Sequence, residues 1–452
     1  MIRNYVGLAL VLSSTCVWAV GCSDDEANTD STTVPDGGRD GSLPTTEPTP
    51  EKDGGADGAT TGTTCPATTG IPQRLIITGG AADTEVVAFN LETKQVDGRY
   101  AFSGFGGASA VDGPYALEQA SDIVTKFDRN EPWKPVASWN VRSNDGIDGG
   151  ATFADPAAVV APACGKGYIL RYNRNRIAVI DTTKSGDAGA ADSFIDLSSL
   201  VQSADSDGSV DPAAAVHVAA KNRLYVVLGN TDLKKVKVVG GYTNLLCSES
   251  KTTLIAIDTT TDKLVSLGGT GPGGGIELPG YNTPINANAL AYDAAADRLL
   301  VLQGGCVADA PGDAVGDMQQ REVDAVDLAT GKASKLLDLN DKGFPVAFAF
   351  ADSTHAALNF YGPTYFWDPS KTTLGAELPG ALEYITHDGK GNLLGIHKAY
   401  NADFTPIAME LYSTPFTNAA TVDESALVKI GAEPFTDNAG SYPSSLDVWP
   451  RP

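Results

Sequence analysis

The chain has 452 residues, with 56 Asp and Glu against 32 Lys and Arg and a formal net charge of -24 at pH 7. Its isoelectric point near 4.4 argues against binding to nucleic acid and against electrostatic docking on anionic lipid, because both carry negative charge. Residues 65–452 are long for one ordinary domain, but they suit a closed ring of small β-sheets.

The chain begins with the features of an export signal. Arg3 precedes an apolar run over residues 5–20, which is too short for a membrane-spanning helix. With a cysteine at the cleavage point, residues 1–21 resemble a bacterial lipoprotein signal, which implies that Cys22 is the lipidated first residue of the mature chain. A diacylated terminus anchors stably, and Ser23 implies, by the same resemblance, sorting to the outer membrane, on either face. An ordinary signal peptide is the alternative.

Residues 22–64 are predicted to form a disordered acidic tether. Between Ser23 and Thr64 there are ten acidic residues and two basic ones, and Gly, Thr, Ser and Pro make up most of the rest. Such a composition buries too little apolar surface to offset the entropy lost on ordering. We expect the segment to stay extended and to space the following domain away from a membrane.

Residues 65–452 repeat one pattern seven times: an apolar strand, a turn, a second strand, and an apolar residue before a terminal residue that is usually Asp. A repeat of roughly forty residues made only of strands is the signature of a β-propeller, in which each copy is one blade. The copies end at Phe89-Asn90, Phe127-Asp128, Ile180-Asp181, Ile257-Asp258, Val326-Asp327, Trp367-Asp368 and, more loosely, Leu411-Tyr412. We therefore predict an all-β, seven-bladed β-propeller.

The two ends of this segment predict how the ring closes. Residues 74–77 align with the second strand of other copies, so blade one has no inner strand of its own at this end. Residues 442–449 resemble the beginnings of other inner strands, such as residues 211–216. A C-terminal inner strand would complete blade one and remove an open sheet edge.

Four cysteines lie in the predicted propeller, and an even number in an oxidising compartment suggests two disulfides. They are Cys65, Cys164, Cys247 and Cys306. Cys247 and Cys306 fall in the long connections between second and third strands of adjacent blades, residues 229–251 and 304–320. We therefore predict a Cys247–Cys306 disulfide and, by elimination, a Cys65–Cys164 disulfide. No CxxC or Cys/His spacing indicates zinc.

Connections that enter the inner strands of a propeller converge on one mouth of its channel, so polar residues there are candidate ligand contacts. These residues are Asp155, Asp211, Asn286, Asn288 and Asp341. Carboxylates and amides in such a funnel suit a cation or a polyol. The alternative is that Asp-Pro only starts a strand, with the Asp bonded to its own backbone.

Residues 205–211 place three carboxylates around a glycine, a combination of hard oxygen ligands and a sharp turn that suits calcium. Asp205, Asp207 and Asp211 are therefore candidate ligands, and calcium is the one candidate cofactor. The segment departs from the full calcium-loop pattern, with Ser203 in place of the first Asp and Ala214 in place of the bidentate Glu. A solvated acidic turn is the alternative.

A basic segment at residues 170–176 stands out in this acidic domain. Arg171, Arg174 and Arg176 flank Tyr172 at a predicted tight hairpin between the second and third strands of blade three. They are candidates for contact with an anionic chelate or with the acidic patch of a partner. Solubilising charges on a hairpin are the alternative.

The repeat grammar of residues 65–452 resembles the bacterial seven-bladed YVTN and gluconolactonase-like propellers. GPYALEQ at 113–119, ADP at 154–156 and RYNR through IAVID at 171–181 are also similar to the MxcI-like lipoproteins that accompany myxochelin-type siderophore genes. That resemblance implies a role near ferric-siderophore uptake, without catalytic residues to transfer. The lactonase branch uses an axial metal with acidic ligands, and its His/Glu arrangement is not evident here.

The sequence holds no HExxH, GxSxG, P-loop or dinucleotide fingerprint. We therefore favour a non-catalytic binding or interaction module, because fold alone does not imply chemistry. Its expected partners are the membrane, through the lipid anchor, and a small ligand or an envelope protein. The alternatives are a metal-dependent lactonase-type hydrolase and a scaffold of an envelope complex.

Overall fold

The computed structural model describes residues 70–80, 83–109, 113–142, 153–239, 242–281, 289–312, 316–360, 362–380, 382–400, 406–432, 434–436 and 442–450. Contacts divide the chain into two units, Met1–Thr63 and Thr64–Pro452, and all described residues belong to the second. The predicted signal, Cys22 and the tether lie outside the described residues. Among the described residues, no helix is long and apolar enough to cross a membrane.

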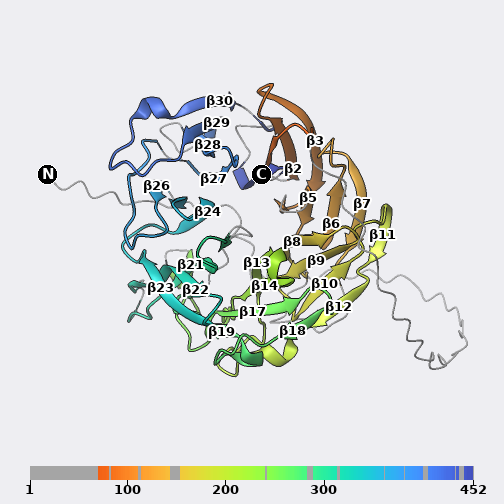
Figure 1. Cartoon of the computed structure of the whole chain (residues 1–452), viewed down its shortest axis with the longest axis vertical. Helices are drawn as coiled ribbons and strands as arrows, with labels where there is room; N and C mark the ends of the chain where they lie inside the picture. Colours follow the sequence, from red (N-terminus) through yellow and green to blue (C-terminus); the bar gives the residue numbers. More distant parts are fainter. Residues whose placement is uncertain are drawn as a thin grey trace, which may run out of the picture. The chain divides into compact units, whose positions relative to one another are not determined.

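The second unit is an all-β ring of seven blades, as predicted (Figure 1). Blade one orders β31 (Tyr442–Trp449), β1 (Arg74–Gly80), β2 (Asp83–Asn90) and β3 (Gln95–Ser103) from the centre outward. Blade two orders β4 (Gly107–Ser109), β5 (Tyr115–Glu118), β6 (Ile123–Phe127) and β7 (Pro135–Asn140), with β11 (Gly186–Ala190) added in parallel at its outer edge. Blade three orders β8 (Pro156–Ala163), β9 (Lys166–Arg171), β10 (Arg176–Ile180) and β12 (Ser193–Asp196).

Blades four to seven continue the same antiparallel order. Blade four has β13 (Pro212–Val218), β14 (Arg223–Leu228), β17 (Thr253–Asp258) and β18 (Lys263–Val265), with β19 (Ile276–Glu277) also on β17. Blade five has β20 (Leu290–Asp293), β21 (Arg298–Val307), β22 (Met318–Asp327) and β23 (Lys332–Asp338). Blade six has β24 (Pro345–Asp352), β25 (His355–Phe360) and β26 (Thr364–Trp367). Blade seven has β27 (Tyr384–His387), β28 (Asn392–Tyr400), β29 (Pro406–Pro415) and β30 (Val428–Ala432).

Elements outside the blades are short. A separate hairpin, β15 (Val236–Val239) and β16 (Tyr242–Leu245), grows from the connection between β14 and β17. The 3-10 turns are η1 (Ser198–Leu200), η2 (Ala219–Lys221), η3 (Pro272–Gly274) and η4 (Glu424–Ala426). None of them interrupts the ring of sheets.

The ring closes through its C-terminal strand, as predicted. β31 pairs with β1 from Arg74 opposite Trp449 to Gly80 opposite Tyr442, with one bulge. In Figure 1 the blue C-terminal segment lies beside the orange strands of blade one. The inner strand of the first blade is therefore the last strand of the chain, and the N-terminal and C-terminal segments share one sheet.

Apolar side chains pack between neighbouring blades. One cluster joins Leu75 and Ile77 of blade one to Leu394 and Ile396 of blade seven, across the closure. The other clusters likewise join consecutive blades around the ring. Each sheet therefore depends on both neighbours to cover its two faces, which explains the near-continuous apolar sequence of the inner strands.

The repeated polar residue at the end of each copy has a structural cause. Its side-chain oxygen accepts the backbone N–H two residues further on, which caps the turn from the third strand to the outer edge of the blade. The residues that do this are Asn90, Asp128, Asp181, Asp258, Asp327 and Asp368. The repeat pattern therefore marks a turn and not a catalytic position.

The predicted Cys247–Cys306 disulfide is present, with Cα atoms 5.0 Å apart. Cys306 nevertheless lies in β21 and not in a loop, because the second strand of blade five runs on to Val307 and pairs there with β22. Gly305 has a φ of +80° and is skipped in that register as a bulge, so residues 304–307, predicted to lie in a long connection, belong to the strand. Cys164 is also disulfide-bonded, and its predicted partner Cys65 lies outside the described residues.

Removing residues 441–452 tests the closure. The deletion removes Leu446, Val448 and Trp449, whose side chains are only 1 to 3% exposed in the intact ring, and it opens the edge of β1. Burial of three such side chains contributes about 6 kcal/mol, close to the whole stability of an ordinary domain, about 5–15 kcal/mol. We expect the cooperative melting transition to be lost in calorimetry. An unchanged melting temperature in the truncated protein would refute the closure.

Replacing Cys247 and Cys306 together by serine tests the clip between blades four and five. The bond closes a loop with a sequence separation of 59 residues, so its removal should lower the free energy of unfolding by about 3 kcal/mol. Urea denaturation of the oxidised wild-type protein and the double variant measures this difference. Equal midpoints in urea would show that the clip does not stabilise the native ring.

Candidate functional site

The connections that carry the candidate residues of blades three and four lie at one face of the ring. Antiparallel pairing sets Pro156 opposite Arg171 in blade three and Pro212 opposite Leu228 in blade four. The connection that precedes an inner strand and the one that follows a second strand therefore lie at the same end of each blade. We call this end of the blades the top face.

Asp155 and Asp211 occupy equivalent positions on the top face of adjacent blades. Both have left-handed backbones, with φ of +56° and +48°. Their carbonyls accept the N–H groups of Tyr172 and Gly229, which fastens the start of each inner strand to the end of the second strand. Their side chains are 9% and 1% exposed, and each has one buried carboxyl oxygen without a hydrogen-bond partner. The Asp of each Asp-Pro pair therefore fastens the backbone through its carbonyl, and it also keeps one carboxyl oxygen that accepts no hydrogen bond.

Burial and neighbouring negative charge dominate the electrostatics of this pair. Burial raises the pKa of Asp155 to about 7, and the nearby Asp122 carboxylate adds to the shift. Burial, followed by the charge of Asp207, holds the pKa of Asp211 well above its usual range. Tyr172 lies close to both, hydrogen-bonded to Thr231, and its pKa is also raised well above 10 by burial and then by the charge of Asp211.

Asp122, in the β5–β6 turn of blade two, is a structural acid that sequence reasoning missed. It is fully buried, and its Oδ1 accepts the backbone N–H of Ala154 at 2.5 Å and that of Asp155 at 3.3 Å. Its Oδ2 forms an ion pair with Arg142 Nε at 2.6 Å. This carboxylate ties blade two to the connection that enters blade three, and its charge is compensated.

Residues 205–211 form a chain of short side-chain caps. The Oδ1 of Asp205 accepts the N–H of Asp207, the Oδ1 of Asp207 accepts the N–H of Ser209, and the Ser209 hydroxyl accepts the N–H of Asp211. Gly208, with a φ of +84°, allows the reversal. The polar residues therefore recur at every second position because each one caps the backbone N–H two residues further on.

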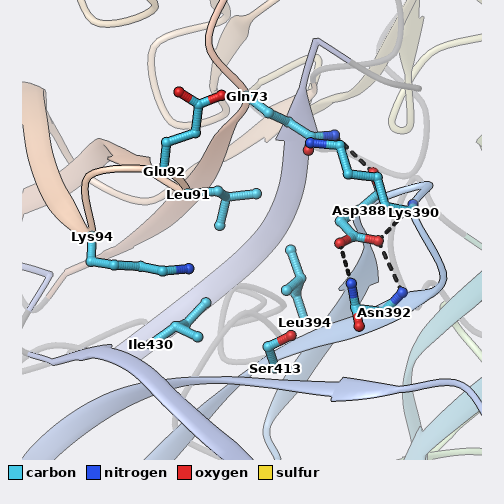
Figure 2. Close-up of a pocket in the computed structure, with 10 residues that line it drawn as sticks. All are labelled: Gln73, Leu91, Glu92, Lys94, Asp388, Lys390, Asn392, Leu394, Ser413 and Ile430. Carbon is cyan, nitrogen blue, oxygen red and sulfur yellow. Dashed lines mark hydrogen bonds between the residues drawn. The ribbon is translucent and has the colours of Figure 1, made fainter.

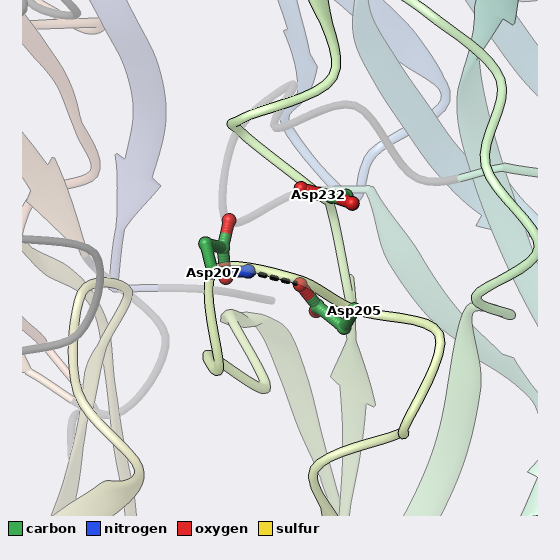
Figure 3. Close-up of side chains that lie close together, drawn as sticks. All are labelled: Asp205, Asp207 and Asp232. Carbon is green, nitrogen blue, oxygen red and sulfur yellow. Dashed lines mark hydrogen bonds between the residues drawn. The ribbon is translucent and has the colours of Figure 1, made fainter.

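A second connection of blade four completes the group. Asp232 follows β14 and is fully buried, and one carboxylate oxygen each from Asp205, Asp207 and Asp232 lie within 4.8 Å of one another (Figure 3). We call these three residues the acidic cluster. Asp207 Oδ2 accepts the N–H of Leu233 at 2.7 Å, and Asp232 accepts the hydroxyl of Ser206, so the two connections hold each other. The sequence prediction grouped Asp211 with Asp205 and Asp207, whereas the structure adds Asp232 to them.

The acidic cluster lacks a compensating cation. Burial, reinforced by the charge of Asp207, raises the pKa of Asp205 to about 7. Within the described part of the chain, the three carboxylates form no ion pair with Lys or Arg, unlike Asp122 with Arg142. Lys234 is nearby, but its Nζ donates to the carbonyl of Ser206 at 2.8 Å. The cluster is a buried group of like-charged carboxylates that backbone N–H groups and the Ser206 hydroxyl contact, without a cationic side chain.

The remaining candidates are placed differently. Arg171 and Arg174 are 0 and 1% exposed, so the acidic patch of a partner cannot reach them, and only Arg176 keeps a partly exposed side chain. Arg171 donates to the carbonyl of Val141 and lies 4.6 Å over the ring of Phe194, which makes it a packing residue. Asp341 is exposed and paired with its neighbour Lys342 at 3.0 Å. Asn286 and Asn288 lie outside the described residues.

A small cavity of about 160 Å³ lies at the opposite face, between blades one and seven (Figure 2). Lys94, Lys390 and Ser413 contribute to its lining. One of its charged side chains, Asp388, is already bonded to the backbone N–H groups of Lys390 and Asn392. The cavity therefore offers less unused hydrogen-bonding capacity than the top face of blades three and four.

No family model matches the chain, and neither does any curated protein. Solved structures with a similar fold include hydrazine synthase of Kuenenia stuttgartiensis, with 14% identity, a TM-score of 0.47, and coverage of 74% of this chain and 86% of that one. A putative 6-phosphogluconolactonase of Bacteroides fragilis has 12% identity, a TM-score of 0.47, and coverage of 85% and 99%. Apo AztD of Citrobacter koseri has 12% identity, a TM-score of 0.45, and coverage of 83% and 98%. Likenesses at this level say nothing about function.

Substituting Asp155 by Asn tests the buried acid. A carboxyl whose pKa rises from 3.8 to about 7 on folding stabilises the protein fully at pH values below 4, and that stability is lost as the pH rises through 7. We expect the wild-type protein to be less stable at pH 8 than at pH 5, with up to about 2.6 kcal/mol of the difference due to this group. The variant Asp155→Asn should lose less stability between pH 5 and pH 8 than the wild type, by the amount that Asp155 contributes.

Urea denaturation at both pH values, in the presence of a chelator, measures the difference. Asp341→Asn is the matched control, because it changes an exposed carboxylate. The same loss of stability with pH in the wild-type protein and in Asp155→Asn would contradict the assignment.

Proposed function

We propose that the protein is an exported, lipid-anchored binding module of the bacterial outer membrane, whose propeller engages a ligand at the top face of blades three and four without transforming it. The observation that carries the proposal is a group of buried acceptor oxygens without hydrogen-bond partners. They belong to Asp155, Asp205, Asp211 and Asn230. Buried acceptors left unpaired cost free energy, so their concentration at one end of two adjacent blades favours a ligand that supplies the missing donors or a positive charge.

The charge of this surface narrows the ligand class. In their ionised form, Asp155, Asp211 and the acidic cluster attract metal cations, amines and polyol hydroxyls and repel anionic chelates. The link to siderophore uptake is supported by the similarity of residues 113–119, 154–156 and 171–181 to MxcI-like lipoproteins. Within such a role, the top face of blades three and four suits a metal ion or a neutral or cationic complex better than an anionic ferric chelate.

The anchoring part of the proposal is supported by the sequence. Cys22 follows a lipoprotein-like signal, and residues 23–64 have the composition of an extended tether. A lipid anchor and a spacer would present the propeller at a distance from the membrane surface.

A second function, metal-dependent hydrolysis of a lactone, is favoured by one observation. Asp155 has a pKa of about 7, which suits a general acid or base at neutral pH. The two functions differ in turnover: a binding module leaves its ligand unchanged, whereas a hydrolase opens a lactone at a rate that depends on Asp155.

Thermal denaturation of the purified protein with a panel of ligands tests the proposal. The panel holds calcium, sugar polyols, sugar lactones and ferric catechol siderophores. We expect one cationic or polyol class to raise the melting temperature, since a ligand at one hundred times its dissociation constant stabilises by about 2.7 kcal/mol. The double substitution Asp155→Asn and Asp211→Asn should abolish the rise, and Asp341→Asn should leave it intact.

Two results would contradict the binding module. Consumption of a sugar lactone, lost in Asp155→Asn, would favour the hydrolase. A flat response to the whole panel would favour a scaffold, which needs only a protein partner.

A further inference from the structure

We propose that Asp205, Asp207 and Asp232 form a binding site for one hard divalent cation, and that calcium is the ion it fits best. This inference rests on the proposed function, which puts ligand binding at the top face of blades three and four. It adds the chemical class of one ligand that binds there.

The geometry of the acidic cluster matches a shared ion. One oxygen from each carboxylate lies within 4.8 Å of the others. Calcium binds oxygen at about 2.3–2.6 Å, so two oxygens on one ion are never more than about 5 Å apart. Figure 3 shows that the three side chains come from two connections that approach each other, one before β13 and one after β14. An ion at their centre would join these connections.

A fourth buried carboxyl, that of Asp211, lies in the same connection as Asp205 and Asp207. Asp211 is 1% exposed, and its Oδ1 is buried without a hydrogen-bond partner, while its Oδ2 accepts the N–H of Thr231. Ser209, whose hydroxyl accepts the N–H of Asp211, donates its own N–H to Asp207, so Asp211 lies in the same capped connection as two members of the cluster. The Oδ2 of Asp205 is also buried and unpartnered. These oxygens supply ligand capacity beyond the three carboxylates, directly or through water.

The charge of the cluster demands a counter-ion. At two other places in the described chain a buried carboxylate does face a cation: Asp122 pairs with Arg142, and Asp293 pairs with Arg298. The acidic cluster has no such partner among the described residues. Buried charge without a partner is strongly unfavourable, and a bound divalent cation would remove the repulsion among the three carboxylates.

The donor set decides the class of ion. All the donors are oxygens, and the absence of nitrogen and sulfur from the cluster disfavours zinc and copper. The carboxylates are also fixed in place: the Oδ1 of Asp207 accepts the N–H of Ser209, and the Oδ1 of Asp232 accepts the N–H of Lys234. Magnesium demands near-ideal octahedral geometry, whereas calcium accepts the irregular arrangement that fixed loop carboxylates provide.

Terbium luminescence and calcium titration test the site on the purified protein after chelator treatment. Terbium takes oxygen ligands like those of calcium, and the Tyr281 hydroxyl, 3.4 Å from the backbone nitrogen of Asp232, is close enough to sensitise it. We expect tyrosine-excited emission that excess calcium displaces, and one calcium ion per chain by calorimetry. The double variant Asp205→Asn and Asp232→Asn should lose affinity at least about 100-fold, and Asp341→Asn should match the wild type.

The fold of the double variant is checked by its melting temperature in chelator, which should equal or exceed that of the wild type because repulsion is relieved. If the double variant does not fold, Asp205→Asn alone serves. Failure of the wild type to bind calcium or terbium, or equal binding by the variant, overturns the site.

The outcomes separate this inference from the proposed function. Stabilisation by another ligand of the panel, without calcium binding, would leave the proposed function standing and refute the cation site. Calcium binding lost in the double variant, together with consumption of a sugar lactone that depends on Asp155, would support the cation site and refute the non-catalytic binding module.

Discussion

Each blade of this propeller buries its apolar faces only against its two neighbours, so every blade depends on closure of the ring. The pairing of β31 with β1 supplies that closure, and the cluster of Leu75, Ile77, Leu394 and Ile396 seals the joint between blades one and seven. Without it, two sheets would expose apolar faces and an open edge.

Closure fixes the connections as well as the strands. The antiparallel register brings the start of β13 beside the end of β14, and this places Asp205 and Asp207 against Asp232 although 25 positions separate Asp207 from Asp232 in the chain. The rigid blades hold these carboxylates together against their mutual repulsion, which separate loops would relieve by moving apart. The acidic cluster is therefore a site that the fold stabilises, and an ion that bound there would return stability to the fold.

Periodicity could predict the blades, the closing strand and the disulfide, because each depends on patterns local to one repeat and on the alignment of repeats. It could not reveal Asp122 or Asp232, which join the site only when two connections meet in space. The burial of Arg171 could not be predicted either, because Phe194, whose ring lies against the Arg171 guanidinium, is on a later strand. The sequence also does not show that β21 continues through Gly305, since a glycine suits either a loop or a bulge within a strand.

We infer that the top face of blades three and four is built to hold positive charge, at the acidic cluster first. Anomalous diffraction from crystals of the protein soaked in terbium tests it most directly, because it locates the ion without reference to activity or stability. The account predicts a strong peak bounded by Asp205, Asp207 and Asp232. A map with no peak there, while terbium occupies sites elsewhere on the protein, would contradict it.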